Sequence, residues 1–233
     1  MDHADSTTPN PLEALVWHDA IRRRPHMYLG DGGTLGTLYL LSCLLECPLQ
    51  PNSIVITLEA GSIRIQARCV PPSVLPREPG QPPYLVEVCT FINAPIDSPA
   101  SVAALEVFDA ECEPPTFKRL AIAPPYLAIA NALSVHFRIG SVTNGVATRA
   151  CFERGVLRSG LLVESTSEAD GLEVQFTLDE ITLYGDDDRL GRFDRFDLVA
   201  EVAREFAHVR RVPVTVIHRM AGAERRFLAE PTR

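Results

Sequence analysis

The second half of the chain carries short segments in which apolar residues recur at every second position, a pattern typical of β-strands with one buried face. Turn pairs at Asn144-Gly145 and Asp170-Gly171 separate some of these segments. Short strands joined by turns predict a largely antiparallel sheet, and helices elsewhere in the chain must then cover its buried face. The strand candidates are residues 135–139, 147–153, 161–164, 172–178 and 214–218.

The covering layer is predicted from apolar residues at helical spacing. Residues 12–21 and 194–209 each have one apolar face, and residues 35–45 are uniformly apolar, as in a buried helix. Pro124 and Pro125 start another buried helix at residues 127–133, because proline fits the first helical turn. A short helix is also expected at residues 100–108.

The remaining segments complete an α+β two-layer sandwich, with one mostly antiparallel sheet and helices on one face. Residues 54–58 and 63–66 read as a strand hairpin around the turn at residues 60–62. Residues 71–83 hold six prolines, which exclude a helix or a central strand and indicate a loop.

Composition limits the classes of function. The 233 residues carry a formal net charge of −8, which argues against direct DNA binding, since DNA affinity comes from cation–phosphate contacts. We interpret the two tight basic clusters, Arg22-Arg23-Arg24 and Arg210-Arg211, as solvated faces. The sequence contains no run of about 18 apolar residues, so no membrane-spanning helix is expected. The acidic, polar N-terminus lacks a secretory pattern, so a cytoplasmic protein is expected.

Residues 19–31, DAIRRRPHMYLGD, resemble the opening signature of the ATP-binding domain of the DNA gyrase B and topoisomerase IV B family. His26 is the notable departure, because the family has glycine there. Residues 130–134 and 170–176 match later family segments in the right order, so the resemblance covers roughly residues 12–218. It implies the GHKL (Bergerat) fold. The resulting division is a flexible arm at residues 1–11, a GHKL domain at 12–220 and a C-terminal tail at 221–233.

The resemblance also assigns positions to the chemistry of ATP hydrolysis. Cys43 aligns with the general base and Cys47 with the magnesium ligand of the family. A neutral thiol is a poor base for activating water, and sulfur is a poor ligand for Mg²⁺. Glu46 lies one position before the ligand position and is expected to point roughly 100° away on the helix.

The adenine and phosphate positions differ from the family as well. Arg68 stands where an aspartate accepts the adenine amino group, and arginine has only donors. Leu172 replaces the supporting threonine, and Cys69 lies where the family has glycine. Residues 120–126 replace the glycine-rich phosphate lid, and Pro124 and Pro125 remove two backbone donors.

These losses predict a pseudo-ATPase that binds no cofactor and acts as a protein-interaction or regulatory module. The alternative is an ATP-binding protein or weak ATPase that uses ATP and Mg²⁺, related to the gyrase-B-type ATPase component of type II DNA topoisomerases. Expected partners are a second copy of the chain, or gyrase or topoisomerase IV subunits. Trp17 and Tyr28 are candidate interface residues, although Trp17 could equally anchor the chain's own core.

Cys43, Cys47 and Cys69 are expected to converge in the former nucleotide pocket. Two interpretations remain: a thiolate metal site or redox-sensitive pair, and simple filling of the pocket by small apolar thiols. We favour filling, because the sequence offers no evident fourth ligand for zinc. His26 is the speculative candidate.

Overall fold

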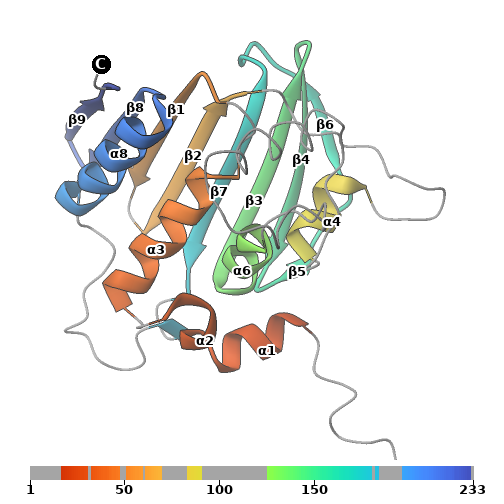
Figure 1. Ribbon diagram of the computed structural model, residues 1–233. Helices are drawn as coiled ribbons and strands as arrows, with labels where there is room; N and C mark the ends of the chain where they lie inside the picture. Colours follow the sequence, from red (N-terminus) through yellow and green to blue (C-terminus); the bar gives the residue numbers. More distant parts are fainter. Residues whose placement is uncertain are drawn as a thin grey trace, which may run out of the picture.

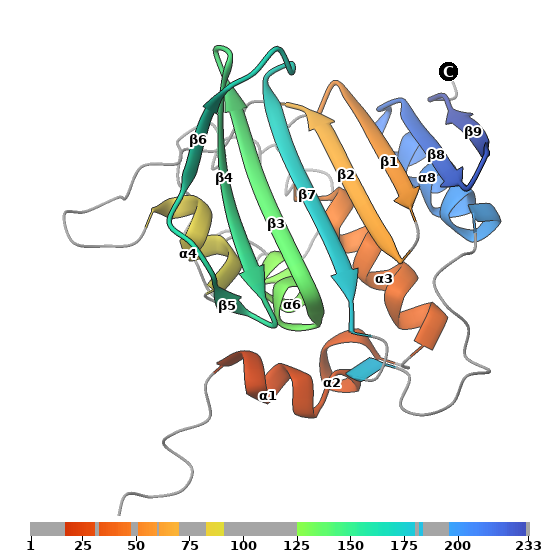
Figure 2. The same cartoon turned by 180° about the vertical axis from the view of Figure 1, so that it is seen from behind.

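The computed structural model describes residues 17–30, 33–47, 51–59, 61–69, 83–90, 125–179, 182–183 and 196–231. The expected arm at residues 1–11, the helix at 100–108 and Pro124 fall outside these ranges. Helices and strands form two layers, with the helices gathered on one face of a single sheet (Figures 1 and 2). The helices are α1 (Trp17–Arg23), α2 (His26–Leu29), α3 (Gly33–Leu45), α4 (Tyr84–Thr90), α6 (Tyr126–Ala132) and α8 (Phe196–Arg210).

The sheet follows the order β5-β4-β3-β7-β2-β1-β8-β9, and β6 pairs with β4 beside β5. Neighbouring strands are antiparallel except for β1 and β8, which run parallel. This confirms the predicted α+β sandwich. The strands are β1 (Ser53–Glu59), β2 (Ser62–Arg68), β3 (Ser134–Thr143), β4 (Val146–Glu153), β5 (Val156–Leu157), β6 (Leu162–Ser165), β7 (Gly171–Leu178), β8 (Val214–Met220) and β9 (Ala223–Ala229).

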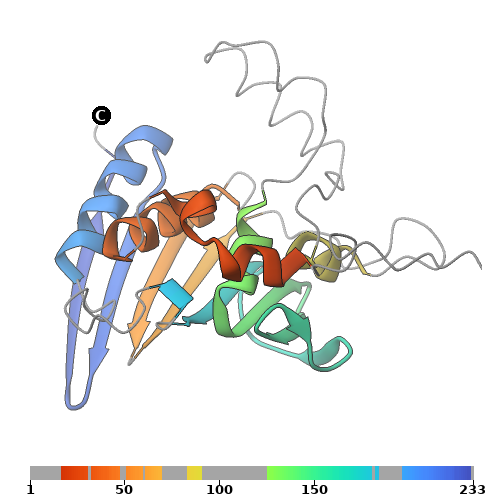
Figure 3. The same cartoon turned by 90° about the horizontal axis from the view of Figure 1, so that it is seen from below.

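Alternation along each strand decides which face meets the helices. In β2, Ile63, Ile65 and Ala67 are buried, whereas the residues between them are only half-buried. Phe176 of β7 lies opposite Ile63 and is buried on the same face. Seen from below, the helices form one layer over this apolar face (Figure 3). None of the described helices combines the length and apolar composition needed to cross a membrane.

The sheet extends further than the sequence predicted. Residues 221–233 were expected to be a C-terminal tail, but β9 lies within them and pairs along its length with β8. The hairpin turn between the two strands contains Gly222, which has a φ of 81°, in the left-handed region that favours glycine. The folded domain therefore continues beyond residue 220.

The arginine clusters are not simply solvated. Arg23 and Arg24 are exposed, as expected. In contrast, Arg22 is half-buried and donates to the carboxylate of Asp179, and Arg210 forms an ion pair with Glu46. Both arginines therefore join elements that are distant in the sequence, which corrects the interpretation of these clusters as free charged faces.

Candidate functional site

Cys43 and Cys47, which the sequence analysis aligned with catalytic positions, lie at the C-terminal end of α3. Cys43 is buried in the last turn of the helix, and Cys47 is half-buried just beyond the end of the helix. The Cys47 thiol donates to the Cys43 carbonyl at 3.6 Å. The same carbonyl accepts from the Glu46 N–H at 3.2 Å, so the Cys47 thiol adds a second donor at the C-terminal turn of the helix.

Burial favours the neutral form of the Cys47 and Cys89 thiols. Burial, followed by the neighbouring Cys43 and Glu46, raises the pKa of Cys47 to about 12. Burial and then Cys47 raise the pKa of Cys89, in α4, well above its ordinary value. Thiolates are the nucleophilic and metal-binding form of cysteine, and burial disfavours that form for both groups. The sequence interpretation did not include Cys89, because α4 was not predicted.

Tyr126, the first residue of α6, lies beside Cys43. Its ring meets that of Tyr39 edge to face, with 6.4 Å between centroids. Burial, followed by the neighbouring Tyr39 and Cys43, raises the pKa of Tyr126 above its ordinary value. Tyr126 ends the segment that stands in place of the phosphate lid. An aromatic ring from that segment therefore lies beside Cys43.

A second group of former pocket residues lies where β2 and β7 meet. Leu172 is buried and pairs with Ala67, while Arg68 is exposed at the end of β2. Burial raises the pKa of Cys69 to about 11, although a hydrogen bond with the Leu172 backbone opposes this rise. This end of the predicted site therefore presents an aliphatic side chain and a neutral thiol, with Arg68 turned to the surface.

Glu46, the residue before Cys47, is engaged by α8. Its two oxygens accept from Nε and Nη2 of Arg210 at 3.0 and 2.7 Å. The side chain is exposed, and the ion pair ties the end of α3 to the end of α8. This geometry agrees with the expectation that Glu46 faces away from the catalytic positions.

The structure thus brings Cys43 together with Cys47, and Cys69 together with Leu172. Cys43, Cys47 and Cys69 are free thiols, as are Cys89 and Cys151. Within the described ranges, no three His, Cys, Asp or Glu side chains are grouped so that they could hold a metal ion. Pro125 directly precedes α6 and provides no side-chain cap.

The two candidate interface residues lie at the N-terminal end of the described chain. Trp17 and Tyr28 are half-buried and pack against the chain's own core. The Trp17 ring also meets His18 edge to face, with 5.3 Å between centroids. Both side chains therefore contribute to the packing of the domain itself.

Comparison with known proteins supports the fold. The chain is similar to the 43K ATPase domain of Thermus thermophilus gyrase B, solved in complex with an aminocoumarin, with a TM-score of 0.65 and 21% sequence identity. The match covers 94% of this chain and 53% of that chain, so this chain spans about half the length of the structure it resembles. No protein-family model matches the sequence. No curated protein matches it either.

Proposed function

We propose that this chain, which has the fold of a gyrase B ATPase domain, is a non-catalytic GHKL domain that acts through protein contacts as an interaction or regulatory module. The observation that carries the proposal is the contact of Tyr126 with Cys43. The buried Cys43 side chain and an aromatic ring lie where the resemblance puts a general base and its water.

The chemistry of the surrounding residues supports this proposal. A triphosphate and Mg²⁺ need oxygen ligands and many hydrogen-bond donors, because unpaired charges are costly to bury. The corresponding positions hold the neutral thiol of Cys47, the buried Leu172 and Pro125, which has no N–H. Such a surface suits apolar packing better than a charged ligand.

The proposed role is contact with other proteins, with the domain retained as a rigid scaffold. A second copy of the chain or a gyrase or topoisomerase IV subunit is the partner that the resemblance suggests. In this proposal the half-buried Trp17 and Tyr28 contribute to the contact from α1 and α2, which lie together at one end of the domain (Figure 1).

The alternative function is an ATP-binding protein or a weak ATPase. The similarity to a gyrase B ATPase domain favours it, because that relative keeps the same layers of helices and sheet. Under this alternative, Mg²⁺ and ATP enter after Tyr126 moves away from Cys43.

A nucleotide titration separates the two functions. We expect ATP or a non-hydrolysable analogue at millimolar concentration, with Mg²⁺, to leave the melting temperature unchanged. A ligand at about 100 times its Kd stabilises by about 2.7 kcal/mol, which is about 5–10 °C for a domain of this size. A gyrase B ATPase domain in the same buffer is the positive control. A rise of several degrees, or phosphate release above background, would support the alternative and contradict the proposal.

A further inference from the structure

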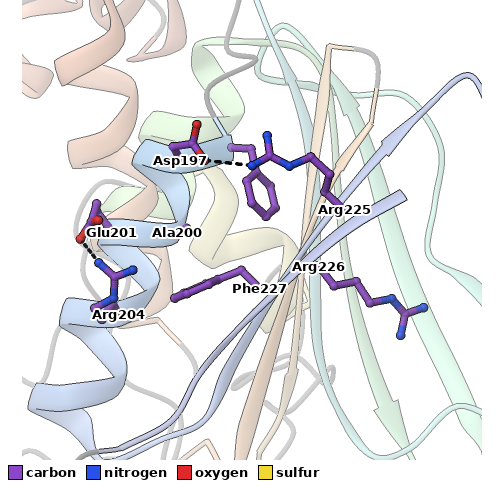
Figure 4. A pocket seen from close by; sticks show the side chains of 8 residues that line it. Asp197, Ala200, Glu201, Arg204, Arg225, Arg226 and Phe227 are labelled. Carbon is purple, nitrogen blue, oxygen red and sulfur yellow. Dashed lines mark hydrogen bonds and ion pairs between the residues drawn. The ribbon is translucent and has the colours of Figure 1, made fainter. Parts of the chain in front are cut away.

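A cleft with a volume of about 490 Å³ lies between α8 and the edge strand β9 (Figure 4). It is separate from the former nucleotide positions on α3, β2 and β7. Its size falls within the range of ligand-binding clefts. The helix wall and the strand wall each contribute a phenylalanine and at least one arginine. The lining residues are Phe196, Asp197, Ala200, Glu201, Arg204, Arg225, Arg226 and Phe227.

Contacts of arginine side chains join the two walls, and a ligand can replace the partners of these arginines. The Arg225 guanidinium lies 4.3 Å from the centre of the Phe196 ring, and its Nη2 donates to Asp197 at 3.1 Å. Arg204 lies 5.1 Å from the centre of the Phe227 ring. The Arg225 and Asp197 side chains are 53% and 85% exposed, so their ion pair contributes little to stability. Because a guanidinium has five N–H donors, Arg225 can bind a further carboxylate.

The strand wall is the last strand in the sheet order. β9 pairs with β8 on one side, and its residues 223–228 are exposed or half-exposed. A sheet edge with unpaired backbone groups is the surface to which an extended peptide can add as a further strand. An added strand would place alternate side chains along the open side of the α8–β9 cleft.

Two consecutive arginines give this edge a chemical preference. Arg225 lies opposite the buried His218 and faces α8, whereas Arg226 lies opposite Ile217 on the other face. Figure 4 shows Arg225 and Phe227 directed toward α8 and Arg226 extending away from it. Adjacent residues of an added strand point to opposite faces as well, so two adjacent acidic residues would meet both arginines.

The charge of the hairpin also selects the occupant. Within the hairpin, three arginines, Arg219, Arg225 and Arg226, outnumber the one acidic residue, Glu224. Their present partners are Glu224 and, from outside the hairpin, Glu59 and Asp197, in exposed ion pairs that a carboxylate of an added strand can exchange with. Two copies of β9 paired antiparallel about its central residue would bring two Arg226 side chains together, and like charges directly opposite are destabilising. The edge therefore disfavours self-pairing in this register and favours an acidic strand.

We infer that β9 and the α8–β9 cleft bind an extended acidic peptide by strand addition, with two adjacent carboxylates paired to Arg225 and Arg226 and a following apolar side chain near Phe227. This inference names a surface and a partner chemistry for the protein-contact role proposed above, on which it rests. Nucleotide binding concerns α3 and β7, so the nucleotide titration and a peptide titration can fail independently.

The test is fluorescence anisotropy with a labelled peptide, Val-Thr-Glu-Glu-Val-Thr, titrated with the full chain at low salt. We expect saturable binding that weakens about tenfold in Arg226→Glu, because reversal turns an attractive cross-strand pair into a repulsive one. Arg158→Glu is the matched control. It makes the same charge change at a 59% exposed side chain near β5, at the other end of the sheet, and should change binding less than about twofold.

Two further peptides complete the design. Replacing the second valine by proline removes a backbone donor, and replacing both glutamates by lysine removes the charge match, so both changes should abolish binding. Equal binding of the lysine peptide, undiminished binding to Arg226→Glu, or absence of binding at millimolar peptide would overturn the inference. A dimer in sedimentation that Arg226→Glu changes would also overturn it, by showing that a second copy occupies the edge.

Discussion

Arg22 attaches the first described helix to the rest of the domain. Its guanidinium donates to the carboxylate of Asp179, to the Ala132 carbonyl at 3.0 Å and to the Thr182 hydroxyl at 3.0 Å. Burial raises the pKa of Asp179, but the hydrogen bond and charge of Arg22 outweigh it and hold that pKa below its ordinary value. One side chain thus joins α1, α6 and the segment after β7.

Replacing Arg22 tests this attachment. We expect Arg22→Ala to lower the free energy of unfolding by about 3 kcal/mol, because it leaves the 7% exposed Asp179 carboxylate without its main partner. Urea denaturation measures the change. Arg23→Ala, at the exposed neighbouring position, is the control and should stay within about 0.5 kcal/mol. Equal effects of the two substitutions would show that the Asp179 pair contributes no stability of its own.

At the same scale, the sequence identified part of the candidate site. The resemblance paired Cys43 with Cys47 at one-turn spacing, and the period-two pattern placed Leu172 at the start of a strand. The contacts of Tyr126 and Cys89 could not be read in this way. They depend on how α4 and α6 pack beside α3, which is set by tertiary contacts between segments far apart in the sequence.

Gly171 sets the close approach of β7 to β2. A Cβ atom at this position would lie 2.0 Å from the Ala67 carbonyl oxygen and 3.3 Å from the Arg68 Cα. Both contacts are to backbone, which cannot rotate away. The residue before it, Asp170, accepts from the Asn144 N–H at 2.8 Å and so ties the start of β7 to the β3–β4 turn.

We therefore expect Gly171→Ala to destabilise the domain by about 3 kcal/mol, through a clash that only a shift of β2 or β7 can relieve. Thermal unfolding followed by circular dichroism measures the loss. Gly160→Ala is the matched control, because a Cβ there would have no heavy atom within 4 Å. A Gly171→Ala protein as stable as the wild type would mean that the two strands separate at little cost.

Two other elements show where sequence patterns lose their power. The helix at residues 194–209 was predicted from its apolar face, and α8 confirms it. β9 was missed because Glu224, Arg225 and Arg226 interrupt the alternation of apolar and polar residues that marks a strand in a sequence. Its pairing with β8, which the sequence pattern does not contain, identifies it as a strand. α4 contains Val86 and Val88, which favour strands, yet it is helical. The Asn131 side chain of α6 donates to the Cys89 carbonyl of α4 at 2.8 Å and helps to hold α4 against α6.

For the whole molecule, buried ionisable groups predict a stability maximum between acid and alkaline limits. On the alkaline side, unfolded thiols lose their proton near pH 9, while Cys69 keeps its proton up to about pH 11 and Cys47 up to about pH 12. The unfolded state then binds fewer protons, so stability falls as pH rises above 9. On the acid side, the stability contributed by Asp179 is present above pH 3.8 and is lost as pH falls through its lowered pKa.

Guanidinium denaturation at a series of pH values measures both limits. We expect Cys69→Ala to make the alkaline fall shallower, because one raised pKa is removed, and to leave the acid limit unchanged. Each such thiol contributes about 1.4 kcal/mol per pH unit within its window. An alkaline slope identical to that of the wild type would show that Cys69 titrates alike in the folded and unfolded chain.

The parallel pair of β1 and β8 has a consequence for biosynthesis. β1 lies inside the finished sheet, between β2 and β8. Its partner on the β8 side is distant in the sequence, because Ile54 of β1 pairs with Val214 of β8. While a ribosome is still translating the intervening residues, the nascent chain exposes the apolar edge of β1 with no strand to cover it. Non-local pairing of this kind is slow and leaves folding intermediates prone to aggregation. Nascent chains that stall before residue 214 should therefore be the ones that chaperones hold longest.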